Sequence, residues 1–203
     1  MTTYIFCHNC EYELFFNTFV RSTINAMTRT VFSFLLICYT LVCFGQNNNI
    51  PQSIQVPEGS KLIRHAYAKG VQIYVCIQDA KDTSHRIWLF TEPRADLYTD
   101  STYHQYIGKH YFERGKYPTW EYTDGSKITG IKLKQANAPD SLGVPWLLLK
   151  AGETGGTGAL KPVVFIQRLY TKGGKAPATA NKSLRRHFLE VPYTAEYFFY
   201  SEK

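Results

Sequence analysis

The chain has 203 residues, which is enough for one domain of ordinary size. It carries 23 basic and 16 acidic residues, and its formal net charge at pH 7 is +7. Nucleic acid is not the predicted partner, because no recognition module is visible and the basic residues are scattered. They form one loose cluster, at Lys172, Lys175, Lys182, Arg185 and Arg186.

The first 45 residues contain the pattern of a secretory signal peptide. Residues 27–30 form a short basic start, and residues 31–42 form an almost wholly apolar run. The small residue Gly45 then precedes a polar stretch, as at a cleavage site. We therefore predict a signal peptide over 27–45 and a secreted or periplasmic protein. The apolar run is shorter than the roughly 20 residues of a membrane-spanning helix, so no stable membrane insertion is expected. Residues 1–26 fit no targeting pattern and are interpreted as an over-extended gene start.

Removal of this leader would leave Cys76 as the one cysteine out of five. A secreted chain without an internal disulfide needs a packed core, and residues 56–203 are long enough to form one. The leader holds two basic and two acidic residues, so the remaining chain keeps its charge of +7. Such a basic surface outside the cytoplasm favours anionic glycans, phospholipid headgroups or acidic wall polymers. The predicted partner is an anionic glycan or a small molecule of unknown identity.

Short runs of β-branched and aromatic residues fill the chain after a polar stretch at 46–55, which is predicted to be a flexible lead-in. The spacing of these runs, with no amphipathic helix of three turns, is typical of a single antiparallel all-β domain, either a sandwich or a small barrel. In chain order, strands are predicted at 61–67, 71–78, 86–91, 97–99, 106–112, 119–123, 126–134, 146–150 and 163–170, with a last strand at 188–200 broken at Pro192.

Two apolar runs, at 144–149 and 163–166, do not alternate with polar residues. A strand with one wet face should alternate, so these runs are predicted to be covered on both faces. The glycine-rich stretch 152–158 between them is predicted to be a flexible loop. It lacks both the Gly-Lys-Ser/Thr ending of a phosphate loop and the spaced glycines of a dinucleotide fingerprint, so no cofactor is expected.

The Asp-Gly pair at 124–125 predicts a hairpin, because this pair favours tight turns with positive φ. A two-residue loop would place Trp120 and Tyr122 on an exposed face as an aromatic platform for a ligand. A three-residue loop would instead pair Trp120 with Ile128 and turn both aromatic side chains into the core. The two alternatives differ by a shift of one residue in the strand register. The core alternative is favoured because aromatic residues in β-sandwiches usually pack inside.

A series of short motifs carries a family resemblance, in the order Val56-Pro57-Glu58-Gly59, Gly70-Val71-Gln72-Ile73-Tyr74, Pro118-Thr119-Trp120-Glu121, Asp124-Gly125-Ser126, Pro145-Trp146-Leu147-Leu148-Leu149-Lys150, Gln167-Arg168, Gly173-Gly174-Lys175-Ala176-Pro177 and Val191-Pro192-Tyr193-Thr194-Ala195. The chain resembles the secreted family known as domain of unknown function 3455. The resemblance implies no established activity. Some similar proteins carry a malate dehydrogenase label, which this sequence does not support, because it lacks a βαβ unit and the glycine fingerprint.

Similar proteins often carry a second cysteine where this chain has Ala180 and Asn181. If that cysteine normally pairs with the one matching Cys76, the resemblance implies that this protein keeps a free thiol. A buried, inert thiol is favoured over a nucleophile, because Cys76 follows a strand of alternating apolar residues.

Few residues are candidates for chemistry. His110 is the strongest histidine candidate, since it lies in an aromatic stretch, and no histidine has the spacing of a metal site, so no metal is expected. Glu121 and Asp124 suggest a glycosidase-like carboxyl pair, although Asp124 has a competing role in its turn. Arg168 ends a buried run and needs a partner, either Glu121 or an acidic ligand.

Three functional hypotheses follow. The favoured one is an exported module that binds a glycan or a small amphiphile, with Trp120, Tyr122 and Arg168 as ligand-binding residues. The second is a hydrolase or isomerase with His110, Glu121 and Asp124 in a barrel mouth. The third is an envelope-associated structural protein.

Overall fold

The computed structural model describes residues 50–180 and 186–203. The predicted gene-start extension over 1–26 and signal peptide over 27–45 lie outside these residues. Within the described part of the chain, no helix is long and apolar enough to cross a membrane.

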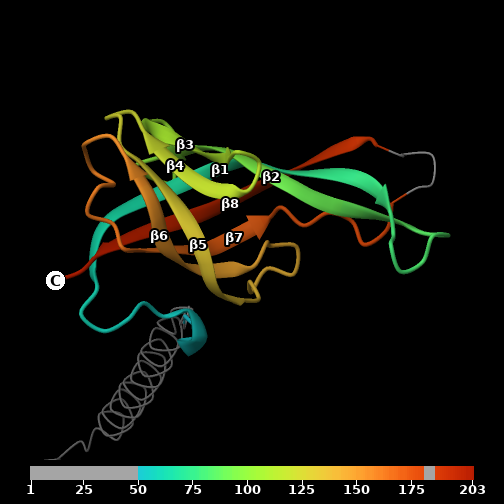
Figure 1. Cartoon of the computed structure of the whole chain (residues 1–203), viewed down its shortest axis with the longest axis horizontal. Coiled ribbons are helices and arrows are strands. Elements are labelled where there is room, and N and C mark those ends of the chain that lie inside the picture. The colour runs from blue at the N-terminus through green and yellow to red at the C-terminus, as the bar shows by residue number, and fades with distance from the viewer. Residues whose placement is uncertain (1–49, 181–185) are drawn as a thin grey trace, which may run out of the picture. The chain divides into compact units, whose positions relative to one another are not determined.

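Antiparallel strands form one closed barrel, in which each strand pairs with the next in sequence and the last pairs with the first (Figure 1). This confirms the all-β prediction and settles the choice between sandwich and barrel. The strands are β1 (Lys61–Gln78), β2 (Arg86–Tyr98), β3 (Tyr106–Glu113), β4 (Tyr117–Tyr122), β5 (Lys127–Ala136), β6 (Trp146–Gly155), β7 (Phe165–Gly173) and β8 (Phe188–Ser201).

Several predicted strands merge into longer ones. The segments predicted at 61–67 and 71–78 are a single strand, β1, which runs through Gly70. A side chain at Gly70 would collide with the backbone of Arg94 and Ala95 on β2, so the glycine permits a close approach of the two strands. The predicted break was therefore wrong because this glycine marks strand contact rather than a turn.

The break predicted at Pro192 is also absent, since β8 continues through it. Pro192 pairs with Val71 of β1, and the pairing of β8 with β7 ends one residue later, at Tyr193. One side of β8 is thus an unpaired edge at Pro192, and an edge tolerates the missing N–H of proline.

Strands β1, β2 and β8 extend beyond the barrel wall as an arm, seen at the right of Figure 1. The pairing of β2 with β3 begins only at Ala95, whereas β1 and β2 pair as far as Gln78 and Arg86. The arm has aromatic side chains at its base, where Tyr74 lies edge-on to Phe90 and Phe90 lies edge-on to Phe112.

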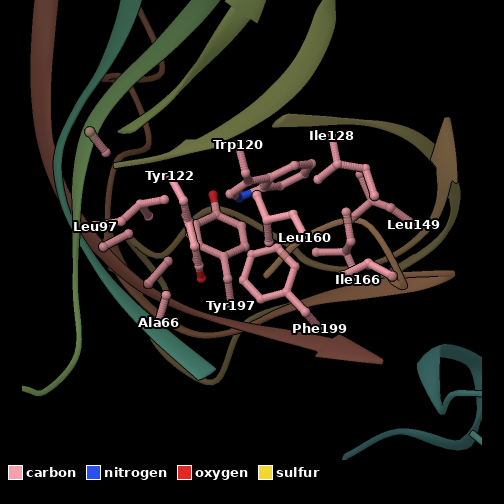
Figure 2. Close-up of a cluster of buried hydrophobic side chains, with 14 of the residues drawn as sticks. Ala66, Leu97, Trp120, Tyr122, Ile128, Leu149, Leu160, Ile166, Tyr197 and Phe199 are labelled. Atoms are coloured by element: carbon pink, nitrogen blue, oxygen red, sulfur yellow. The ribbon is translucent and has the colours of Figure 1, made fainter. Parts of the chain in front are cut away.

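The hairpin between β4 and β5 has the three-residue loop, because Trp120 pairs with Ile128 and the Tyr122 amide donates to the Ser126 carbonyl. Trp120 and Tyr122 therefore face the interior, as the favoured alternative predicted, and the exposed-platform alternative is wrong. Figure 2 shows Trp120 packed with Tyr197 and Phe199, and their rings meet edge to face.

A second apolar cluster lies on the outside of β6 and β7, where Trp146, Leu148 and Leu169 pack around Ile54. Ile54 ends a short 3-10 turn, η1 (Gln52–Ile54), and is fully buried. The structure thus corrects the predicted flexible lead-in for residues 50–55, which are packed against the barrel. This outer cluster also explains why the 144–149 run does not alternate, since one face meets the interior and the other meets η1.

Candidate functional site

The barrel encloses a cavity of about 580 Å³. Side chains from all eight strands line it, so the cavity lies inside the barrel and not on its outer surface. Its more exposed lining residues, including Tyr117 and Ile131, mark the mouth, and buried residues such as His110 and Trp120 mark the inner end. Volumes of roughly 300–1,000 Å³ are typical of small-molecule sites.

Most of the cavity wall is apolar. The lining residues without polar side-chain groups include Phe90, Phe112, Pro118, Val144, Leu147 and Leu149. Gly130 also lines the cavity, and a Cβ atom there would lie 2.9 Å from Trp120 Cζ3 and 3.0 Å from Leu149 Cδ2. The absence of a side chain at this position therefore leaves the room that the Trp120 indole occupies.

His110 and Trp120 are cross-strand neighbours on β3 and β4, and their rings stack with centroids 4.6 Å apart. The Nδ1–H of His110 donates to the Thr119 carbonyl at 2.9 Å, which leaves Nε2 as an acceptor in the neutral ring. Burial lowers the pKa of His110 to about 3, and the nearby Arg168 charge lowers it further, against the opposing effect of the Thr119 hydrogen bond. His110 is thus a neutral, buried ring at physiological pH.

Arg168 enters the cavity from β7, opposite Leu147 on β6 and Tyr197 on β8. Its Nε and Nη2 groups both donate to the Pro145 carbonyl, at 3.2 and 2.9 Å. Among residues 50–180 and 186–203, no carboxylate forms an ion pair with Arg168. The partner that the sequence required for this arginine is therefore a backbone carbonyl, which is neutral.

Several buried polar atoms around Arg168 lack a hydrogen-bond partner in the described part of the chain. They are Gln72 Nε2, Trp120 Nε1, Tyr193 Oη and Tyr197 Oη. Arg168 and Tyr193 lie close enough to the Tyr197 phenol to affect its pKa, which burial raises, yet no hydrogen bond of normal geometry joins them. The inner end of the cavity is thus polar and incompletely hydrogen-bonded.

Glu121 does not reach this cavity. It follows Trp120 on β4 and so faces the outside of the barrel, where it accepts a hydrogen bond from the Tyr111 hydroxyl at 2.6 Å and lies 3.5 Å from Lys109 Nζ. The Tyr111 hydrogen bond is the main cause that lowers the pKa of Glu121. The structure therefore does not bring Glu121 together with His110 or Arg168.

Asp124 has a structural position in the β4–β5 turn. Its carboxylate accepts hydrogen bonds from the Ser126 amide at 2.8 Å and the Ser126 hydroxyl at 2.6 Å, and from the Ala159 amide at 2.8 Å. Asp124 thereby joins the hairpin to the loop after β6. It is not a lining residue of the cavity, and neither is Tyr122. The flexible loop predicted over 152–158 is only partly present, because residues 152–155 continue strand β6, where Thr154 and Gly155 pair with Ile128 and Lys127 of β5.

Sequence reasoning missed Gln72, Tyr193 and Tyr197 as cavity or near-cavity groups. The period-two pattern of Tyr193, Ala195, Tyr197 and Phe199 was a usable signal, since alternate residues of a strand share a face. Cys76 is buried and free, as predicted. No group of three or more His, Cys, Asp or Glu side chains with a metal-binding arrangement occurs in the ranges that the structure covers.

The family model of a protein of unknown function, DUF3455, matches residues 57–201. The chain belongs to this family. The match spans all eight strands of the barrel, so the DUF3455 domain and the barrel coincide. No curated protein and no solved structure matches the chain.

Proposed function

We propose that this DUF3455 protein is an exported binding protein that holds a small amphiphilic molecule inside its barrel. The observation that carries the proposal is the cavity of about 580 Å³, with apolar walls and a polar inner end. Sites of this kind gain affinity from the apolar area that they cover and orientation from a few polar groups. The predicted signal peptide supports a role outside the cytoplasm.

The cavity favours an amphiphile over a glycan. Sugars usually bind on open aromatic faces, and Trp120, with 1% of its surface exposed, offers none. The positions of Glu121 and Asp124 also weigh against the hydrolase hypothesis. Neither carboxyl lines the cavity, and no acidic side chain of the described residues pairs with the neutral His110 there.

Binding can be tested with the neutral fluorescent dye Nile red and its displacement by dodecanoate or dodecanol. We expect wild-type protein to bind the dye and at least one competitor to displace it. Leu147→Trp places a larger side chain in the cavity and should weaken dye binding by at least about tenfold. The matched control is Leu142→Trp, since Leu142 is exposed in a loop outside the cavity. Equal dye binding by both variants would contradict an internal site.

A further inference from the structure

The charged side chains that line the cavity are all positive. Arg168, Lys116 and Lys132 line it, whereas no aspartate or glutamate of residues 50–180 and 186–203 does. His110 adds no charge near neutral pH because burial keeps its ring unprotonated. Arg168 is partly buried, and removing a positive charge from water is costly unless an opposite charge or strong acceptors accompany it. Arg168 has only the Pro145 carbonyl, so its charge is not neutralised by the described residues.

The geometry of the Arg168 guanidinium leaves room for a planar anion. The edge formed by Nε and Nη2 is directed at the Pro145 carbonyl. No hydrogen bond of normal geometry joins the other edge, formed by Nη1 and the second hydrogen of Nη2, to a described residue, although the Tyr197 hydroxyl lies close to Arg168. Two parallel N–H groups on one edge match the two oxygens of a carboxylate.

The unpaired groups around Arg168 are also suited to an anion. Gln72 Nε2 and Trp120 Nε1 are obligatory donors, and the Tyr197 hydroxyl can donate. All three residues line the cavity, and each is at most 2% exposed. A buried donor without an acceptor destabilises a fold, so an acceptor-rich group bound in the cavity would stabilise these donors.

We propose that the bound molecule is a singly charged anionic amphiphile of the fatty-acid type, with its carboxylate at Arg168 and its apolar tail along the walls toward the mouth. This inference rests on the proposed binding function. Its structural basis is the guanidinium of Arg168, its cross-strand neighbour Tyr197, and the unpaired donors of Gln72 and Trp120 that line the same cavity. Lys116 and Lys132, nearer the mouth, would attract the anion during entry.

The experiment compares three ligands with the same tail and different heads: dodecanoate, dodecanol and dodecyltrimethylammonium, each below the concentration at which it forms micelles. Displacement of Nile red at pH 7.5 gives their dissociation constants. We expect dodecanoate to bind at least about tenfold more tightly than the other two, because hydrogen bonds to charged groups are among the strongest in proteins.

Arg168→Met keeps the unbranched apolar stem of the side chain and removes its charge. In this variant the affinity for dodecanoate should fall to that for dodecanol, whereas dodecanol binding should be unchanged or stronger. Lys172→Met is the matched control, since Lys172 lies on the same strand, carries the same charge and is exposed outside the cavity. Arg168→Lys keeps the charge without the two-pronged edge, and we expect intermediate affinity for dodecanoate. Arg168→Lys is also the replacement test of the role of Arg168 if Arg168→Met does not fold.

The outcomes separate the two proposals. If none of the three molecules displaces the dye from wild-type protein and the dye itself does not bind, the binding function is wrong. If dodecanol or the cationic molecule binds as tightly as dodecanoate, the binding function stands and the anionic assignment is overturned. An Arg168→Met variant that folds and retains full dodecanoate affinity would likewise overturn the role of Arg168.

Discussion

At the residue scale, the environment of His110 decides what this side chain can do. A general base works best when its pKa lies near the working pH, and burial holds the pKa of His110 at about 3. A ring of this kind rarely carries a proton at neutral pH and is a weak base. Its Nδ1–H is fixed on the Thr119 carbonyl, and its face is covered by Trp120. Packing and hydrogen bonding, rather than proton transfer, account for these contacts.

The lowered pKa of His110 predicts a pH dependence of stability. In the unfolded chain the ring takes up a proton near pH 6.5, whereas in the folded chain it does so only near pH 3. The unfolded state therefore binds more protons between these values, and stability is lost as the pH falls through the window. His110 alone should lower the free energy of unfolding by about 2 kcal/mol from pH 7 to pH 5.

The measurement is urea unfolding at the two pH values for wild type and His110→Asn. Asparagine can keep the hydrogen bond to Thr119 and cannot be protonated in this range. The variant should lose less stability on acidification than wild type. An equal loss in both proteins would show that His110 is not the source of the pH dependence.

Glu121 shows how a neighbouring residue can be excluded from a site by strand geometry. Successive side chains of a strand point to opposite faces, so a glutamate next to the inward-facing Trp120 must face outward. The sequence contained this conclusion as soon as the register of the hairpin was chosen. It also excludes Glu121 as the partner of Arg168, whose guanidinium donates to the Pro145 carbonyl instead.

At the element scale, the sequence located all eight strands, but it missed residues 92–96 of β2 and 151–155 of β6 and did not predict how all segments join. Strand segments follow from local patterns, and β3, β5 and β7 were predicted nearly complete. Gly70 and Pro192 were interpreted as breaks because their local preferences favour turns. Their actual roles depend on the neighbouring strands. Gly70 lies against the backbone of β2, and Pro192 lies at an unpaired edge of β8.

The hairpin between β4 and β5 and the loop after β6 are two elements that meet at one carboxylate. Asp124 accepts hydrogen bonds from both, and Gly158 allows the close approach, since a Cβ atom there would lie 2.7 Å from Asp124 Cγ. Asp124→Ala removes these bonds and leaves the Ala159 amide unpaired. We expect a loss of about 2 kcal/mol in the free energy of unfolding, as is usual for hydrogen bonds to a charged group.

Urea unfolding of Asp124→Ala would be compared with Glu121→Gln, which alters a carboxylate on the barrel exterior. The glutamine variant should change stability by less than about 1 kcal/mol, because exposed ion pairs contribute little. Nile red binding should be retained in both variants. Loss of dye binding in a stable Asp124→Ala protein would place Asp124 in the binding machinery, contrary to its position in the turn.

At the scale of the whole molecule, closure of the barrel creates the cavity, and this could not be predicted from local patterns. Closure requires β1 to pair with β8, and these strands are the most distant in sequence. The same closure brings Gln72 of β1, Trp120 of β4 and Arg168 of β7 around one space. A sandwich with the same strands would have distributed these residues differently. The residues that line the cavity therefore could not be predicted without knowledge of the barrel closure.

The lead-in at residues 50–55 belongs to this whole-molecule organisation. Ile54 fills the outer cluster, and its carbonyl accepts a hydrogen bond from Gln167 Nε2 at 2.6 Å, while Gln167 Oε1 accepts one from Tyr200. The segment before β1 is thereby tied to β7 and β8, near the end of the chain. If it unfolds together with the barrel, a change at Ile54 should affect the global stability.

Ile54→Ala should therefore lower the free energy of unfolding by about 2 to 4 kcal/mol, because it empties a buried site. Leu142→Ala, at an exposed loop position, should change it by no more than about 0.5 kcal/mol. Urea unfolding followed by tryptophan fluorescence and by circular dichroism should give one coincident transition, shifted to lower urea in the Ile54 variant. An unchanged midpoint would mean that the lead-in detaches before the barrel unfolds and contributes nothing to its stability.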